Sequence, residues 1–200
     1  MNYQVILDGV LENLKGTPKL LLHACCAPCS SYVLEYLSKY FEITVFFYNP
    51  NMDKEEEYIK RLNELERFIK EFKSINPIHL VSKDYHHEEF LKIANGLHDV
   101  PEKGIRCHKC YRLRMEEAFI YAKENCFDYI TTTLTLSPHK DSRVINEIGK
   151  ELEEKYHFPY LYSDFKKRDG YKRSIVLSRE YNLYRQDYCG CEFSKNKLSH

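Results

Sequence analysis

The chain alternates short apolar runs with longer amphipathic stretches, and this alternation restricts its fold more than any other feature of the sequence. Strands are expected at residues 18–23, 43–48, 78–81 and 129–133, with a weaker candidate at 158–162. Helices are expected in the N-terminal stretch and at residues 30–40, 54–71, 86–94, 107–124 and 141–155. Strands that alternate with helices favour a parallel sheet covered on both faces. The sequence therefore predicts an α/β fold, with functional residues in the loops beyond the carboxyl ends of the strands.

The size and composition of the chain fit one globular domain that spans residues 1–200. Hydrophobic residues make up 43% of the chain and charged residues 30%, a balance that argues against disorder. Lys and Arg together number 30, and so do Asp and Glu. This neutral balance excludes a strongly basic, histone-like nucleic-acid binder.

Two segments are locally basic although the whole chain is neutral. Residues 161–200 contain nine Lys or Arg against five Asp or Glu, and residues 101–115 contain five against Glu102 alone. Each segment lies beside a cysteine pair. The two segments are either solvated surface or a positive rim around a thiol site, and such a rim would suit a phosphate-bearing substrate.

The N-terminal stretch is typical of an amphipathic helix, because it lacks the basic start of an export signal and acidic residues interrupt its apolar positions. The longest apolar run, LLLHACCAPC, is about half as long as a bilayer-spanning helix. We therefore expect a cytoplasmic protein with no membrane partner and with reduced cysteines. Clustered thiols in such a compartment more often bind metal or carry out redox chemistry than form structural disulfides.

Seven of the eight cysteines fall into three clusters. They are Cys25, Cys26 and Cys29 in HACCAPCSS, Cys107 and Cys110 in CHKC, and Cys189 and Cys191 in YCGC. The eighth, Cys126, stands alone and is expected to be a buried, inert residue. Among the histidines, His23 is expected to close the first strand within the core, and His139 to line a loop at the strand ends.

The first two clusters have the spacing of a metal site. Each lies near the start of a predicted helix, where free N–H groups and a partial positive charge favour thiolates. The pairs Cys26-x2-Cys29 and Cys107-x2-Cys110 would suit a four-thiolate zinc site that only stabilises the fold. Four thiolates from two loops also match an iron–sulfur cubane. The additional Cys25 and the third cysteine pair favour redox chemistry, but the spacing alone is compatible with both metals.

Cys189 and Cys191 are separated by Gly190 alone. A disulfide between them would close a small ring, and glycine is the residue best able to adopt the backbone angles of such a ring. Strained disulfides are comparatively easy to reduce and tend to be labile or catalytic. The alternatives are two reduced thiols near the end of the chain or two further metal ligands.

Several motifs, in their order along the chain, resemble those of the QueH-type epoxyqueuosine reductases. They are LLHACCAPCSS, FFYNPNMD, EEY followed by Arg61, CHKCYRLR and YCGCEFS, and they extend from Leu21 to Ser194. The resemblance thus covers nearly the whole chain, and the order of its cysteine motifs is specific. It implies an enzyme of bacterial tRNA modification. The implied reaction removes the epoxide oxygen of epoxyqueuosine at the tRNA wobble position, which is the last step of queuosine biosynthesis.

The resemblance also implies a cofactor and a set of site residues. A [4Fe-4S] cluster, with no need for cobalamin, would be held by Cys25, Cys26, Cys107 and Cys110. Cys29 is spare in that set and is a candidate ligand of an additional iron ion. Cys189 and Cys191 would form a redox-active pair, supplied with electrons by an unidentified donor.

The implied fold is similar to that of PP-loop (HUP-like) ATPases, with a helical, cysteine-bearing C-terminal segment at about residues 161–200. Lys166, Lys167 and Arg168 are the candidate tRNA contacts, because an RNA stem-loop offers phosphates to basic side chains. Two other functions share some of these features. An iron–sulfur tRNA thiolase of the PP-loop kind would need a glycine-rich ATP loop, which is not found after the first strand. A zinc-stabilised RNA-binding module would have no catalytic role.

Overall fold

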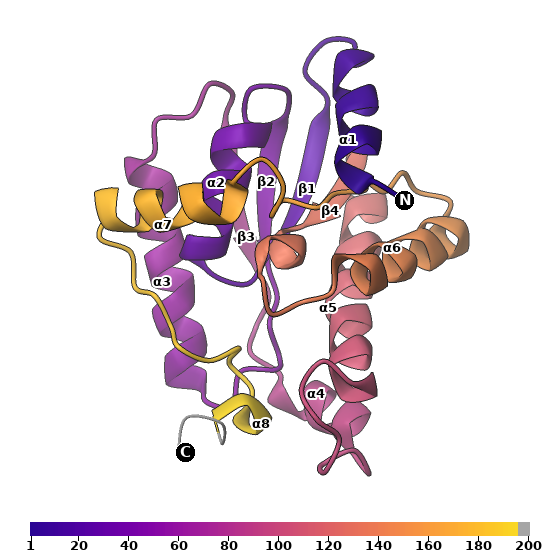
Figure 1. The fold of residues 1–200 in the computed structure, drawn as a ribbon, viewed down its shortest axis with the longest axis vertical. Coiled ribbons are helices and arrows are strands. Elements are labelled where there is room, and N and C mark those ends of the chain that lie inside the picture. Colours follow the sequence, from indigo (N-terminus) through magenta and orange to yellow (C-terminus); the bar gives the residue numbers. More distant parts are fainter. Residues whose placement is uncertain (196–200) are drawn as a thin grey trace.

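The computed structural model describes residues 1–195, and its centre is a sheet of four parallel strands (Figure 1). The strands are β1 (Lys19–Ala24), β2 (Glu42–Phe47), β3 (Ile78–Ser82) and β4 (Tyr129–Thr132). Their order in the sheet is β3-β2-β1-β4, and β1 pairs in parallel with both β2 and β4. The predicted α/β class and parallel sheet are therefore confirmed, and the arrangement is compatible with a HUP-like fold.

β1 lies in the middle of the sheet because its apolar run is buried on both faces. Leu20 and Leu22 belong to a core shared with α1 (Tyr3–Glu12), α2 (Ala27–Leu37) and α3 (Glu55–Glu71). Leu21 belongs to a second core, shared with α5 (Ile105–Glu124) and α6 (Ser142–Tyr156). Fully burying each leucine contributes roughly 1.5–3 kcal/mol. The LLL run therefore fixes β1 between two helical layers.

The remaining helical elements surround the carboxyl ends of the strands. They are α4 (His87–Ala94), the 3-10 helix η1 (Thr133–Leu136), α7 (Gly170–Glu180) and the short α8 (Glu192–Lys195). α7 packs against α2, and the chain then runs along α3 to α8 (Figure 1). The basic C-terminal segment is thus helical in part, and its last five residues, 196–200, lie outside the described residues. Within residues 1–195, no helix combines the length and the apolarity needed to traverse a bilayer.

The prediction of a fifth strand at residues 158–162 is wrong. The segment makes a single parallel bridge, between Ile130 and Tyr160. Beyond that bridge, the backbone groups that would extend the ladder form hydrogen bonds with side chains instead. Thr131 Oγ1 donates to the Leu161 carbonyl (2.8 Å), and Ser163 N–H donates to Asn146 Oδ1 (3.0 Å). The ladder therefore ends after one residue pair.

The helices that carry cysteines begin earlier than predicted. α2 begins at Ala27 rather than at residue 30, with Cys26 as the extended residue before it and Pro28 in its first turn. Proline fits there because the first helical N–H groups have no partner within the helix. α5 begins at Ile105, two residues before Cys107. Cys29 and Cys107 therefore lie in the first turns of their helices.

Gly170 permits the close contact between α7 and α2. A Cβ atom at this position would lie 2.1 Å from the Phe165 carbonyl oxygen and 2.3 Å from Cε1 of Tyr32. We expect Gly170→Ala to destabilise the fold by about 1–3 kcal/mol, because the backbone must shift to relieve the overlap. The midpoint of urea unfolding measures this loss.

Gly9→Ala is the matched control, because nothing lies within 4 Å of a Cβ built on Gly9 in α1. Alanine is the better helix former by about 1 kcal/mol, so this midpoint should stay or rise. Equal midpoints for the two variants would show that the contact at Gly170 is not tight.

Candidate metal and redox site

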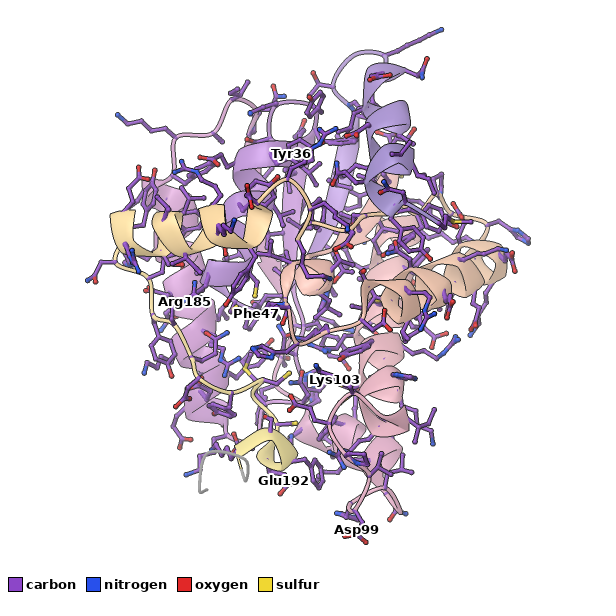
Figure 2. The ribbon with its side chains drawn as sticks, in the orientation of Figure 1. Tyr36, Phe47, Asp99, Lys103, Arg185 and Glu192 are labelled. Carbon is purple, nitrogen blue, oxygen red and sulfur yellow. The ribbon has the colours of Figure 1, made fainter. Side chains whose placement is uncertain are left out.

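Thiols from three separate segments line one cavity of about 260 Å³ at the carboxyl end of the sheet. Cys25 and Cys29 come from the β1–α2 junction, Cys107 from the start of α5, and Cys189 and Cys191 from the C-terminal segment. In Figure 2 the labelled Arg185 and Lys103 flank the region in which side-chain sulfur atoms gather. Cysteines that are up to 166 residues apart in the sequence thus line one cavity. This cavity lies at the strand ends, where the sequence predicted the functional residues.

Cys25, Cys26 and Cys29 form the tightest group of thiols. Their sulfur atoms all lie within 4.8 Å of one another, and the Sγ atoms of Cys25 and Cys26 are 3.8 Å apart. Within residues 1–195, this is the one group of three or more His, Cys, Asp or Glu side chains with a spacing suited to a metal ion. Cys25 and Cys26 lie in the short connection between β1, which ends at Ala24, and α2, which begins at Ala27 and carries Cys29 in its first turn. This change from strand to helix brings the three sulfur atoms together.

Hydrogen bonds within this group concentrate its negative charge on one sulfur. Hydrogen bonding from the Cys26 thiol, and then from Cys29, holds the pKa of Cys25 well below its usual range. The same contact with Cys25 raises the pKa of Cys26 to about 12, and the pKa of Cys29 is likewise raised. Within the group the thiolate form is therefore favoured at Cys25, and metal binding to all three sulfurs would release the protons that they hold.

The second group of thiols, Cys107 and Cys110, lies near the start of α5, and Cys107 alone of the two lines the cavity. Burial raises the pKa of Cys107, and it raises the pKa of Cys110 to about 12. Cys110 packs in a small apolar cluster with Phe90, against which Cys191 lies. Cys25 and Cys107 line the same cavity, but the predicted ligand set of Cys25, Cys26, Cys107 and Cys110 is not gathered within 4.8 Å.

The Cys189–Gly190–Cys191 turn is held by the residues that follow β2. The backbone N–H of Asp53 donates to the Gly190 carbonyl (3.0 Å), and Arg61 Nη1 donates to the Cys189 carbonyl (3.3 Å). Gly190 adopts a φ of +115°, which side-chain-bearing residues rarely adopt. Both cysteines are free thiols, and burial raises the pKa of Cys191.

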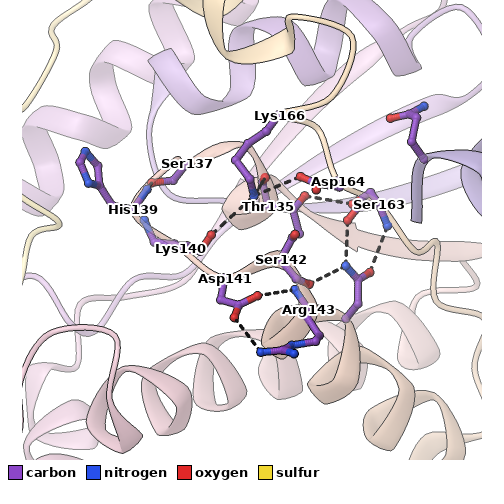
Figure 3. A network of polar contacts seen from close by, with 12 residues as sticks. Thr135, Ser137, His139, Lys140, Asp141, Ser142, Arg143, Ser163, Asp164 and Lys166 are labelled. Atoms are coloured by element: carbon purple, nitrogen blue, oxygen red, sulfur yellow. Dashed lines mark hydrogen bonds and ion pairs between the residues drawn. The ribbon is translucent and has the colours of Figure 1, made fainter. Parts of the chain in front are cut away.

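The loop after η1 forms another wall of the cavity, and Lys166 holds it in place (Figure 3). Lys166 Nζ donates to the carbonyls of Thr135 (3.0 Å) and Lys140 (3.5 Å) and pairs with Asp164 (3.0 Å). His139 and Lys140 from this loop line the cavity, as expected for His139. Burial opposes the charged form of Lys140, but the nearby Cys189 and Cys25 sulfurs outweigh it and raise its pKa.

The three basic residues proposed to bind tRNA lie outside the cavity lining. Lys166 holds the loop after η1, Arg168 pairs with Asp8 at 2.5 Å, and Lys167 is exposed. Their contact with tRNA stays a prediction.

Two single-residue expectations had different outcomes. His23 is fully buried, with Nδ1 2.9 Å from Thr132 Oγ1 and Nε2 3.2 Å from the Tyr48 carbonyl, which confirms its core role. Cys126 was expected to be buried, but it is exposed. The reason is its position in the turn between α5 and β4, where its φ is +56°.

Two buried arginines lie at the cavity, and the sequence assigned no role to either of them. Arg61 and Arg114 both line the cavity, and they are 2% and 1% exposed. Helical spacing could have revealed Arg114, because residues four apart lie on the same helix face and Arg114 follows Cys110 by four.

The geometry agrees with the comparison of this sequence with known proteins. The family profile described as "Epoxyqueuosine reductase QueH" matches residues 20–197. The chain is 40% identical over 204 residues to Epoxyqueuosine reductase QueH of Staphylococcus epidermidis, covering 98% of this chain and 86% of the relative. It is 42% identical over 199 residues to the protein of the same name from Streptococcus pyogenes, covering 97% of this chain and 78% of the relative. It is 34% identical over 181 residues to the protein of the same name from Thermotoga maritima, covering 88% of this chain and 89% of the relative. The chain therefore belongs to the epoxyqueuosine reductase QueH family.

Proposed function

We propose that this protein reduces epoxyqueuosine at the wobble position of tRNA to queuosine, the last step of queuosine biosynthesis. The observation that carries the proposal is the convergence of five cysteines, from three distant segments, on one cavity. A structural zinc site would need no more than four thiolates and no cavity. The reductase proposed here would use both a metal-binding group and a second thiol pair that reaches the same cavity.

The thiols present fit a thiolate-bound metal centre. Cys25, Cys26 and Cys29 offer three soft sulfur donors, of which Cys25 is already the preferred thiolate. An iron–sulfur cubane presents separate irons to its ligands, so the sulfurs that hold it need not touch one another. A [4Fe-4S] cluster would accordingly be held by Cys25, Cys26, Cys107 and Cys110, with Cys29 placed to bind an additional iron. When bound, this centre would supply one-electron transfer and a Lewis-acidic iron, without cobalamin.

The remaining residues account for the electron balance. Conversion of an epoxide to an alkene and water consumes two electrons and two protons. Oxidation of the Cys189 and Cys191 thiols to a disulfide releases two electrons and two protons. The pair would then be reduced again by an electron donor outside this chain. Both thiols line the cavity with Cys25, so the exchange needs no large movement of the chain.

The function predicts a coloured, iron-containing protein. Anaerobically purified protein should absorb broadly in the visible range. It should contain about four irons and four sulfides per chain, or slightly more iron. With a chemical reductant it should convert epoxyqueuosine-containing tRNA to queuosine-containing tRNA, as followed by nucleoside mass spectrometry. A colourless protein with one stoichiometric zinc, even after anaerobic reconstitution with iron and sulfide, would overturn the redox function and leave the zinc-stabilised RNA-binding module.

Lys167 offers the cleanest test of the proposed tRNA contact. Its side chain makes no hydrogen bond or ion pair with residues 1–195, whereas Lys166 and Arg168 hold contacts of the fold. If Lys167 binds a phosphate, Lys167→Glu should weaken tRNA binding and lower the salt dependence by about one released counterion. Filter binding or fluorescence anisotropy at several salt concentrations measures both effects.

Lys73→Glu is the matched control, because Lys73 is exposed near the amino-terminal edge of the sheet, opposite the cavity. It should leave tRNA affinity nearly unchanged. Equal affinity for wild type and Lys167→Glu at low salt would remove Lys167 from the interface.

A further inference from the structure

Two guanidinium groups, which come from opposite sides of the sheet, line the same cavity. Arg61 comes from α3 and Arg114 from α5, and the two helices belong to different cores. Both side chains are almost completely buried, and both line the thiol cavity. Buried arginines are costly unless their charge and their N–H groups are satisfied.

Each arginine is fixed by two of its three nitrogen atoms. Arg61 donates from Nε to Glu57 Oε1 (2.6 Å) and from Nη1 to the Cys189 carbonyl (3.3 Å). Arg114 donates from Nε to the Cys110 carbonyl (3.2 Å) and from Nη1 to Asn49 Oδ1 (3.3 Å). The third nitrogen, Nη2, is buried and has no hydrogen-bond partner in either residue. Unsatisfied buried donors of this kind call for a ligand that is acceptor-rich.

The charges indicate that this ligand is anionic. Glu57 neutralises Arg61 in part, but Arg114 pairs with no carboxylate within residues 1–195. The sulfurs of the cavity are further groups near both arginines that can carry negative charge. Cys26 and Cys25 act on Arg61, and Cys110, Cys189 and Cys25 act on Arg114. Metal binding converts these thiols to thiolates and so places several negative charges beside the two arginines.

We infer that Arg61 and Arg114 are the paired counter-charge of the thiolate-bound metal centre, with their free Nη2 groups directed at its negative charge. The two arginines act through the cysteines and the metal, so they are positioning residues rather than catalytic ones. The inference rests on the metal-binding part of the proposed function and is independent of the substrate. It predicts that removal of either charge weakens metal binding even where every cysteine is kept.

Cobalt(II) binding to the reduced, metal-free chain tests this inference without the reaction. Thiolate-to-cobalt charge transfer reports the bound metal, and a chelator in competition gives the affinity. Arg61→Gln and Arg114→Gln should each lose about 10–100-fold in cobalt affinity, the usual effect of removing an outer partner of metal ligands. Arg114→Lys, which keeps the charge, should retain most of the affinity.

Two half-buried arginines on the same helices are the matched controls. Arg67→Gln on α3 removes ion pairs with Glu64 and Glu71 and bonds to the Tyr181 and Asn182 carbonyls, and Arg112→Gln on α5 removes an ion pair with Glu151. Neither arginine lines the cavity, so both variants should leave cobalt affinity unchanged. If a glutamine variant at the buried positions does not fold, Asn49→Asp decides the matter. It keeps an acceptor for Arg114 Nη1 and sets a negative charge beside it, so it should also weaken cobalt binding. Because it removes the Asn49 Nδ2 bond to the Ala24 carbonyl as well, the decisive result is unchanged affinity, which would overturn the counter-charge.

The outcomes separate this inference from the proposed function. Wild-type protein that binds no cobalt would contradict the metal site itself. Wild-type binding with unchanged affinity in Arg61→Gln, Arg114→Gln and Asn49→Asp would overturn the counter-charge alone. Variants that keep cobalt affinity but bind tRNA less tightly would show that the Nη2 groups serve a substrate phosphate, and the inference would be wrong.

Discussion

Replacement of Cys25 or Cys26 by serine should abolish stable metal binding. These sulfurs lie 3.8 Å apart, in the tightest thiol group of the described chain and in the proposed cluster set. Structural zinc in zinc-finger peptides binds with about 10–16 kcal/mol shared among its ligands, so one lost ligand should reduce the affinity by about a hundredfold or more. Iron, sulfide and cobalt content after anaerobic gel filtration measure the loss.

Cys126→Ser is the control for this experiment, because Cys126 is an exposed thiol far from the three clusters in sequence. It should keep the full metal content. Cys29→Ser tests whether Cys29 belongs to the cluster ligands. It should lose only the additional iron if Cys107 and Cys110 complete the cluster. Full metal content in Cys25→Ser would show that the centre is built elsewhere.

Replacement of Cys189 and Cys191 by serine should stop turnover while leaving the metal in place. Dithiothreitol, as the sole reductant, readily reduces an accessible disulfide by thiol–disulfide exchange. With this reductant we expect turnover to fall by about a hundredfold or more, which corresponds to about 2.7 kcal/mol of barrier. The measurement is the conversion of epoxyqueuosine-containing tRNA by metal-loaded protein.

Metal content and a second reductant show which role the pair has. Unchanged iron in the double variant would exclude a ligand role, and dithionite, which can reduce a cluster directly, should restore part of the turnover. The relay is wrong if the double variant keeps full turnover with dithiothreitol. Loss of both iron and turnover would instead make Cys189 and Cys191 metal ligands.

The sequence was sufficient to predict the sheet because apolar runs such as LLLH are long enough to mark buried strands. It also placed the cysteine clusters at strand ends, where parallel topology brings distant loops together. The start of α2 was missed because the residue before it, Cys26, makes no side-chain capping bond, so the usual polar signal was absent. The fifth strand was overpredicted because apolar residues at 158–162 enter the core without a ladder.

The site was harder to predict than the fold, since its pattern depends on groups that no local motif connects. Arg61 and Arg114 reach one cavity from different helices, and only tertiary packing shows that their Nη2 atoms lack partners. Lys166 resembles a substrate contact in sequence because basic residues surround it. Its observed bonds to Thr135 and Lys140 are with backbone carbonyls that lie more than 20 residues away.

The anchors of the C-terminal turn have a consequence for how a redox pair can cycle. Asp53 and Arg61 hold Gly190 and Cys189 through peptide carbonyl oxygens and not through sulfur. Carbonyl oxygens are the same acceptors whether the two sulfurs are bonded to each other or not. The two hydrogen bonds that hold this turn can therefore stay in place in both oxidation states, because neither depends on the sulfur atoms.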